Sequence, residues 1–165
     1  MYYSHYESPV GRLLLVGDGE NIHRIEFPTN CRPVNLDASW EHNEVVFGTL
    51  TKELDAYFNG SLQVFSVQVA PTGSAFQHKV WNALQQIAYG QTCTYADIAK
   101  LIGKPTASRA VGSANGRNPV SIIIPCHRVI GTNGALTGYA GGISAKQWLL
   151  SHEAGEQSLF PFDEW

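Results

Sequence analysis

The pattern of hydrophobic and polar positions begins with three short runs that are typical of β-strands, at residues 2–7, 12–17 and 21–27. Two turn-forming segments, SPVG at 8–11 and GDGE at 17–20, separate them. Short apolar runs divided by Gly, Pro and Asp favour hairpins. The pattern therefore predicts an antiparallel meander at the start of the chain.

Farther along, apolar residues recur at helical spacing until Gly60, a plausible C-terminal stop. Residues 63–69 then alternate in the manner of a half-buried strand. Residues 1–70, called here the N-terminal half, are thus expected to form a small α+β layer. The residues at helical spacing are Val45, Val46, Leu50, Leu54, Tyr57 and Phe58.

The segment PTG at 71–73 breaks this pattern and predicts a domain boundary, so that residues 71–165 form a C-terminal half. Helical spacing dominates there. Ser74 and Gln77 have the spacing of a capping box and predict a helix that ends near residues 89–90. Its inner face carries Phe76, Val80, Trp81, Leu84 and Ile87.

Two shorter helices follow, capped by Thr94 and Thr106 and joined by the turn GKP at 103–105. A tight turn between short helices is typical of a helix-turn-helix, although many helical corners that bind no DNA share it. The second helix surrounds Arg109 with small residues, which permit close approach to a surface or simply pack against neighbours. The inward positions are Ile98, Leu101, Ile102, Ala107, Ala110, Val111 and Ala114.

The last predicted helix begins at a third capping-box pair, Ser144 and Gln147, and turns Trp148, Leu149 and Leu150 inward. Glu153 lies near its end, where the helix dipole disfavours an acid. His127 or Arg128 could compensate this charge, or Glu153 could be solvated.

Composition adds a charge asymmetry to this picture. The 165 residues have a net charge of −3, but residues 1–70 carry −5 and residues 71–165 carry +2. Four of the five acids in the C-terminal half lie in the last thirteen residues, so the stretch from 79 to 146 is distinctly basic. The overall charge argues against a nucleic-acid partner, whereas the basic stretch leaves one open.

The three cysteines, Cys31, Cys93 and Cys126, are far apart and form no CxxC pair. No signal-peptide pattern begins the sequence, and no apolar run approaches the roughly 18 residues needed to span a bilayer. We therefore expect a soluble cytoplasmic protein whose cysteines remain thiols.

The candidate chemistry lies in residues 118–139. An apolar run at 122–124 leads through Pro125 to Cys126, and His127 and Arg128 follow at once. An apolar lead-in alone would suit an inert buried thiol. An adjacent imidazole is the usual agent that takes a thiol proton, so the pattern favours an active nucleophile.

The segments PCHRVIG and GYAGG, followed by K-x-W-L-L-x-x-E, resemble the O6-alkylguanine-DNA alkyltransferases of the single-chain bacterial type. The resemblance runs from about residue 74 to about 155. It implies an RNase H-like N-terminal α+β domain, matched only in size and element order. A mostly helical C-terminal domain of winged helix-turn-helix type would follow.

The resemblance also implies a reaction and its residues. Cys126 would accept the alkyl group irreversibly from O6 of a flipped guanine, or from O4 of an alkylated thymine. His127 would take the thiol proton through a water, and Glu153 would orient His127. Tyr95 would donate to the departing guanine, and Asn118 would tie the recognition helix to the active-site strand.

Double-stranded DNA containing O6-alkylguanine is the implied partner, bound through its minor groove by a monomer. Arg109 would fill the space left by the flipped nucleotide. The implied DNA-binding set also includes Thr94, Tyr95, Ala107, Ala110, Gly112, Ser113 and Arg128. The implied substrate pocket consists of Pro125, Val129, Tyr139 and Ala140.

Ala140 and Ser121 depart from the serine and proline that some members carry there, which leaves the preferred adduct open. Because the N-terminal half has only Cys31 and no ligand pair at motif spacing, we expect no zinc, and no cofactor. Two alternatives share parts of this pattern: a cysteine hydrolase using Cys126, His127 and Glu153, and a lesion-binding protein that transfers nothing.

Overall fold

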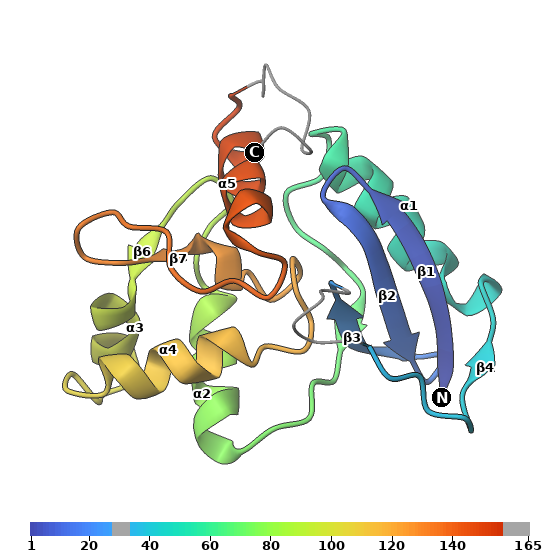
Figure 1. The fold of residues 1–165 in the computed structure, drawn as a ribbon, viewed down its shortest axis with the longest axis horizontal. Helices are drawn as coiled ribbons and strands as arrows, with labels where there is room; N and C mark the ends of the chain where they lie inside the picture. Colours follow the sequence, from blue (N-terminus) through green and yellow to red (C-terminus); the bar gives the residue numbers. More distant parts are fainter. Residues whose placement is uncertain (28–33, 157–165) are drawn as a thin grey trace.

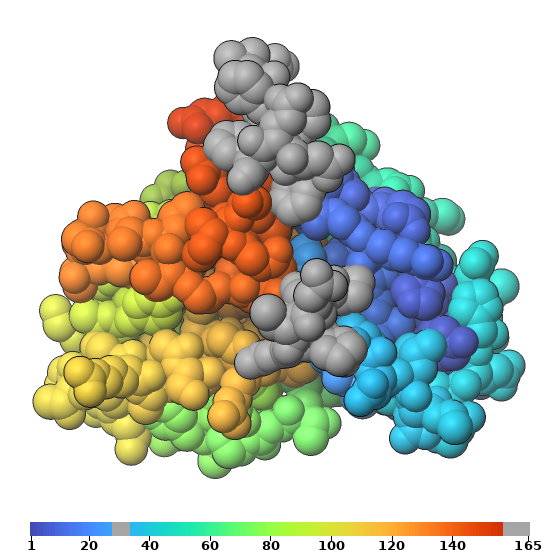
Figure 2. Space-filling model, viewed as in Figure 1, coloured from blue at the N-terminus to red at the C-terminus, as the bar shows by residue number. Residues whose placement is uncertain are grey.

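The computed structural model describes residues 1–27 and 34–156. The two halves lie side by side, with the sheet and its helix on one side and the shorter helices on the other (Figure 1). Figure 2 shows the same division on the surface, where the blue sheet and the orange residues after about 130 occupy opposite sides. Buried side chains of both halves nevertheless belong to one continuous core.

The predicted meander is confirmed. Strands β1 (Tyr2–Ser8), β2 (Gly11–Gly17) and β3 (Asn21–Glu26) pair antiparallel in sequence order. Two short strands extend the sheet at its edges, β4 (Glu41–His42) parallel to β1 and β5 (Gln68–Val69) parallel to β3.

The strand predicted over residues 63–69 is wrong for all but its last two residues. The Glu53 carboxylate accepts hydrogen bonds from the backbone N–H of Ser66 at 3.1 Å and from its hydroxyl. It also accepts from the Val67 N–H at 3.3 Å. Because a side chain takes these donors, the backbone there has no need of a strand partner.

The helix predicted to end before Gly60 is confirmed as a 3-10 turn, η1 (Val45–Phe47), that runs into α1 (Gly48–Phe58). The chain turns away at Gly60, whose φ is +85°. Leu50, Leu54 and Tyr57 form the buried face of α1 against the sheet. Val45 does not share that face, since it lies on the preceding turn and is 87% exposed.

The C-terminal half consists of α2 (Ala75–Leu84), α3 (Tyr95–Leu101), α4 (Ser108–Gly116) and α5 (Ile143–Glu153). Between α4 and α5 lie a 3-10 turn, η2 (Cys126–Arg128), and β7 (Val129–Ile130), which pairs in parallel with β6 (Cys93–Thr94). The helix α2 packs beneath α4, where the Trp81 Nε1–H donates to the Ala114 carbonyl at 2.9 Å.

Two of the four predicted helix caps are correct. Ser74 and Thr94 each form a full capping box. Thr106 and Ser144 do not cap their helices, because α4 begins after Ala107 and α5 after Gly142, whose φ is +89°. Three further details differ from the pattern: α2 ends at Leu84, before residues 89–90, Leu101 is 56% exposed, and Ala110, expected to face inward, is exposed.

The sheet continues directly into the segment that precedes Cys126. The Ile25 N–H donates to the Pro119 carbonyl at 2.9 Å, and the Ile25 carbonyl accepts from the Ser121 N–H at 3.2 Å. These bonds form a parallel bridge between Ile25 and Val120. The active-site strand expected after Asn118 is limited to this single bridge, followed by turns.

Candidate active site

Cys126 stands at the start of η2 and is 4% exposed. The turn before it is unusual, since the buried Ile122 has a φ of +74°, a conformation that β-branched residues rarely adopt. Asn118 stabilises this turn. Its amide donates to the Ile124 carbonyl at 2.8 Å, and its carbonyl accepts from the Val120 N–H at 3.0 Å. A strained backbone over-determined by its surroundings is typical of functional sites.

The surroundings of the thiol act on its pKa in opposite directions. Burial raises the pKa of Cys126, whereas the nearby amide of Asn118 and the charge of Lys146 lower it. The net effect is upward, so Cys126 is a neutral thiol at rest. Lys146 is itself fully buried and donates to the carbonyls of Val129 at 2.6 Å and Thr137 at 3.0 Å.

His127 has the arrangement of a general base. Its Nε2 lies 2.7 Å from Glu153 Oε1, and its Nδ1 is buried with no hydrogen-bond partner among the described residues. A carboxylate on Nε2 assigns the proton to that nitrogen and leaves the lone pair on Nδ1. Burial lowers the pKa of His127 despite the opposing effect of Glu153, which keeps the imidazole neutral.

Glu153 is the last residue of α5, and its negative charge is compensated by both His127 and Arg128. Besides His127, Arg128 binds it in a bidentate manner, through Nε to Oε2 at 2.8 Å and Nη2 to Oε1 at 2.9 Å. Arg128 is held in turn by its Nη1–H, which donates to the Ile87 carbonyl at 2.7 Å. Burial alone would raise the pKa of Glu153, but the hydrogen bonds from His127 and Arg128 prevail and hold it well below its ordinary value.

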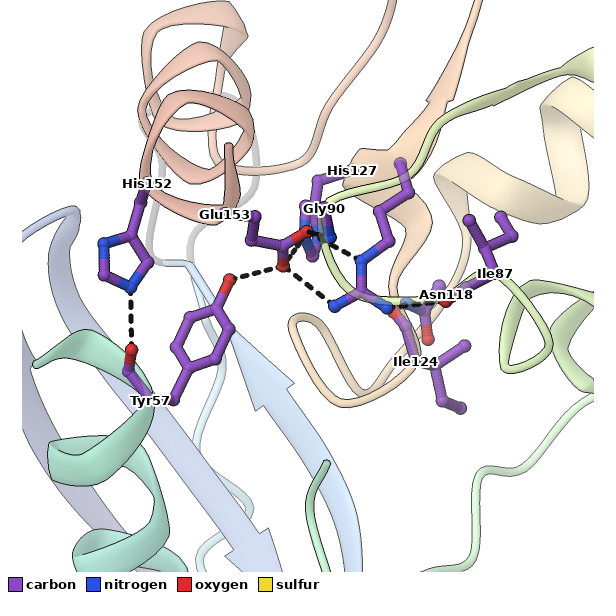
Figure 3. A network of polar contacts seen from close by, with 9 residues as sticks. Tyr57, Ile87, Gly90, Asn118, Ile124, His127, His152 and Glu153 are labelled. Atoms are coloured by element: carbon purple, nitrogen blue, oxygen red, sulfur yellow. Dashed lines mark hydrogen bonds and ion pairs between the residues drawn. The ribbon is translucent and has the colours of Figure 1, made fainter. Parts of the chain in front are cut away.

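A third donor to Glu153 comes from the N-terminal half. The Tyr57 hydroxyl donates to Glu153 Oε1 at 2.7 Å, across 96 residues of sequence. Figure 3 shows Tyr57 and His152 side by side next to Glu153 and His127. No local pattern indicates this contact, because Tyr57 falls at helical spacing among core residues and resembles any buried aromatic. Lys146, the first residue of the K-x-W-L-L-x-x-E segment, was not expected among the site residues, because helical spacing indicated only the apolar face of its helix.

A cavity of about 660 Å³ lies between α3, α4 and the loop after β7. Tyr95, Arg109 and Gly112 line it on the helical side, and Tyr139 and Ala140 on the loop side. The Tyr95 hydroxyl lies 3.1 Å from Thr137 Oγ1. Among the described residues, the Tyr139 hydroxyl is buried without a hydrogen-bond partner, and burial raises the pKa of Tyr139 well above its ordinary value.

Two of the four residues expected in the substrate pocket do not line this cavity as the structure describes it. Pro125 and Val129 are buried. Both flank the turn that carries Cys126, and Val129 accepts from Lys146 through its carbonyl. Their backbone closes the thiol turn, since the Pro125 carbonyl accepts from the Arg128 N–H at 3.0 Å and the Val129 N–H donates to the Cys126 carbonyl.

The residues expected to contact DNA divide into three groups by exposure. Arg109, Ala110 and Ser113 are exposed on α4, and Thr94, Tyr95, Ala107 and Gly112 are half-buried. Arg128 is the exception, with only 7% of its surface exposed. The expectation that Arg128 binds DNA stays a prediction, and in this structure its guanidinium is engaged with Glu153 and Ile87 inside the protein.

Family models account for nearly the whole chain. Residues 1–71 match the model described as "6-O-methylguanine DNA methyltransferase, ribonuclease-like domain". Residues 75–155 match the companion model, "6-O-methylguanine DNA methyltransferase, DNA binding domain". The methylated-DNA–protein-cysteine methyltransferase of Methanosarcina acetivorans is 52% identical over 93% of this chain and 98% of its own length. The chain belongs to the 6-O-methylguanine DNA methyltransferase family.

Other members of the 6-O-methylguanine DNA methyltransferase family agree with this assignment. The methylated-DNA–protein-cysteine methyltransferase of Haemophilus influenzae is 45% identical over 93% of this chain and 86% of its own length. A crystal structure of Mycobacterium tuberculosis OGT in complex with DNA superposes with a TM-score of 0.86, at 43% identity and 94% coverage of both chains. The α+β class expected from the sequence, a ribonuclease-like part followed by a mostly helical part, is confirmed.

The described residues of this methyltransferase family member show neither a cluster of metal ligands nor a helix that could span a membrane. They contain no group of three or more His, Cys, Asp and Glu side chains gathered as for a metal ion. Cys31, considered above as a ligand, lies outside them. Within the same residues, no helix combines the length and the apolar character needed to cross a bilayer.

Proposed function

We propose that this protein repairs DNA by direct reversal, transferring the alkyl group of O6-alkylguanine to the sulfur of Cys126 once per molecule. Family membership supports the reaction class. The observation that carries the assignment to residues is the state of His127. One ring nitrogen is hydrogen-bonded to Glu153, and the other is buried and unpaired beside the residue that bears the thiol.

The proposed alkyl transfer needs no cofactor. The thiol proton passes through a water to His127 Nδ1, the sulfur attacks the alkyl carbon, and an S–C bond forms as the C–O bond breaks. Because burial raises the pKa of Cys126 and lowers that of His127, both groups are neutral at rest. The ionised Glu153 then stabilises the imidazolium that forms. The product is a thioether, which no group of this site can hydrolyse.

The guanine leaves as an anion unless a donor meets its charge. Tyr95 lines the cavity and carries a hydroxyl whose present partners are groups of Thr137. We assign it the role of that donor. Since Ala140 has no side-chain hydroxyl, only its backbone N–H can bond the guanine oxygen. The cavity volume of about 660 Å³ falls within the range of small-molecule sites, roughly 300–1,000 Å³.

DNA docks through α4. Its exposed small residues, Ala110 and Ser113, let the backbone approach the duplex closely, and Arg109 projects at the rim of the cavity. This arrangement suits minor-groove binding, in which a side chain intrudes where the base has been extruded. Thr94, Ala107 and Gly112 border the same surface, and the protein acts as a monomer.

The chain divides in this proposal into an N-terminal structural domain, residues 1–70, and a C-terminal domain with the DNA-binding and active-site residues, 71–165. The break at residues 71–73 supports the division.

Mass spectrometry after incubation with DNA containing O6-methylguanine tests the proposal. We expect one added methyl group, on the peptide that contains Cys126, and product formation that stops near one equivalent when substrate is in large excess. Turnover beyond one equivalent would instead indicate a hydrolase. Binding of the lesion without any methyl addition would indicate a protein that only recognises damage.

A further inference from the structure

The carboxylate of Glu153 receives more hydrogen bonds than orienting a histidine requires. Oε1 accepts from His127 Nε2, from Arg128 Nη2 and from the Tyr57 hydroxyl, at 2.7, 2.9 and 2.7 Å. The first two donors lie on η2, next to the thiol. The third lies at the end of α1, in the half that supplies no other side-chain hydrogen bond to Glu153 among the described residues.

Tyr57 is held firmly enough to serve as a fixed point. It is fully buried, and the rings of Phe58, Phe65, Tyr89 and His152 surround it with centroids 5.1 to 6.1 Å away. Its carbonyl accepts from His152 Nε2 at 2.7 Å. Two hydrogen bonds of opposite direction therefore join Tyr57 to consecutive residues at the end of α5, as Figure 3 shows.

The phenol acts on Glu153 in two ways. Burial, followed by the effect of Glu153, raises the pKa of Tyr57 well above its ordinary value, so the hydroxyl remains a neutral donor. Arg128 fixes the plane of the carboxylate, and the phenol fixes Oε1 from the opposite domain. It also withdraws charge from Oε1, which moderates the attraction of that oxygen for the His127 proton.

The charged and titratable groups that face the pair of His127 and Glu153 come from several elements. Arg128 lies on η2 and Lys146 on α5, and both disfavour a protonated His127. Tyr139 contributes a ring 6.5 Å from the imidazole, and Tyr89 lies beside Arg128. Because only Glu153 favours the imidazolium, the charge available on its Oε1 determines how readily His127 becomes protonated.

We propose that Tyr57 is a positioning residue for alkyl transfer, through which the N-terminal half holds Glu153 Oε1 against His127 Nε2 and leaves His127 Nδ1 available to Cys126. The role rests on the function proposed above. It gives the ribonuclease-like half a part in the reaction through Glu153, although none of the described residues of that half lines the cavity.

The test compares Tyr57→Phe with wild type in single-turnover methyl transfer across a range of pH. We expect the rate constant to fall about tenfold, since small misplacements of reacting groups cost up to roughly a hundredfold. The acidic limb should also move to higher pH, because the unshielded carboxylate raises the pKa of His127. Affinity for alkylated DNA should not change, since Tyr57 is fully buried.

Two variants separate positioning from packing. Tyr6→Phe is the matched control, because Tyr6 also donates to a carboxylate of the N-terminal half, Asp55 at 2.6 Å, on the exposed surface. It should transfer methyl at the wild-type rate. Substitution of Tyr57 by 3-fluorotyrosine keeps both ring and hydroxyl and should restore most of the rate lost in Tyr57→Phe.

Nuclear magnetic resonance of the His127 ring nitrogens gives a second measurement that needs no substrate, so it separates failure of this inference from failure of the proposed function. We expect wild type to carry the proton on Nε2 and Tyr57→Phe to titrate at higher pH. An unchanged His127 titration together with a wild-type transfer rate in Tyr57→Phe would overturn the role. Equal rate losses in the phenylalanine and fluorotyrosine variants would also overturn it.

Discussion

The two halves of the molecule differ most in what they bury. In the N-terminal half, as far as the structure describes it, Ser4 is the one buried residue of a polar type besides Tyr57, whose buried hydroxyl binds Glu153. The C-terminal half buries seven: Asn115, Asn118, Ser121, His127, Arg128, Lys146 and Glu153. Buried charges are costly unless they are paired and hydrogen-bonded. The comparison shows where this protein tolerates that cost, namely around a thiol whose proton must be moved.

The backbone differs in the same way. The N-terminal half is built on a three-stranded antiparallel ladder with one register shift, between Val16 and Gly17, whereas the segment around Cys126 consists of turns, a three-residue 3-10 helix and Ile122 in the left-handed region. Irregular backbone places the reactive groups, and the regular half supplies fixed points at Ile25 and Tyr57. The following changes test this division of roles, from the largest expected effect to the smallest.

Cys126→Ala should abolish methyl transfer completely and still bind DNA containing O6-methylguanine, because the surface of α4 is untouched. Transfer is measured by mass spectrometry, and binding by fluorescence anisotropy at fixed salt, since phosphate contacts make affinity salt-dependent. Loss of binding together with transfer would mean that the thiol supports the fold of the docking surface.

Glu153→Gln should lower the free energy of unfolding by about 3–5 kcal/mol, the usual consequence of breaking a buried ion pair by removing one partner. The buried Arg128 would lose the anion that compensates it. Chemical denaturation measures the effect. A change below about 1 kcal/mol, the range of surface pairs, would place this network with the exposed ion pairs of the N-terminal half.

The pKa shifts of Glu153 and His127 predict how the free energy of unfolding depends on pH. The pKa of Glu153 is lowered from its ordinary value of 4.5 in the folded state, so its contribution is present above pH 4.5 and is lost as the pH falls. The lowered pKa of His127 acts in the same direction below its ordinary value of 6.5. Stability should therefore decline from about pH 6.5 downward, and the part of the decline below pH 4.5 that comes from the Glu153 carboxylate should be missing in Glu153→Gln. Parallel acid-unfolding curves for the two proteins would contradict this prediction.

Arg109→Ala should impair transfer from duplex DNA more than transfer from a free alkylguanine base, which needs no flipping. We expect a difference of about tenfold, or roughly 1.4 kcal/mol of the few kcal/mol that flipping costs. Single-turnover rates on the two substrates measure it. Equal losses on both would remove Arg109 from the flipping step.

Arg12→Ala should change the free energy of unfolding by less than about 0.5 kcal/mol, as for most exposed ion pairs. Arg12 lies 3.1 Å from Glu7, and both side chains are more than half exposed. The variant is measured by the same denaturation as Glu153→Gln. A cost comparable to that of Glu153→Gln would mean that charge contributes as much in the N-terminal half as beside the thiol.

The sequence predicted those features that depend on local patterns. The meander follows from turn residues between short apolar runs, and the caps at Ser74 and Thr94 follow from residues three apart. The compensation of Glu153 by its neighbours in the PCHR segment was also anticipated, from its unfavourable place at a helix end. Two caps failed because Gly142 and Ala107 begin their helices without any side-chain signal. Contacts such as Tyr57 with Glu153 join residues 96 apart, and no spacing rule encodes them.

The two backbone hydrogen bonds of Ile25 limit how far this protein can be truncated. Its N–H and carbonyl both bind the segment that leads to Cys126. A fragment starting after residue 70 would retain the thiol, the imidazole and the docking helices, yet lose the edge that sets their backbone and the phenol that holds Glu153. We therefore expect the smallest autonomous repair unit to include Ile25 and Tyr57, although both are buried away from the surface that docks DNA.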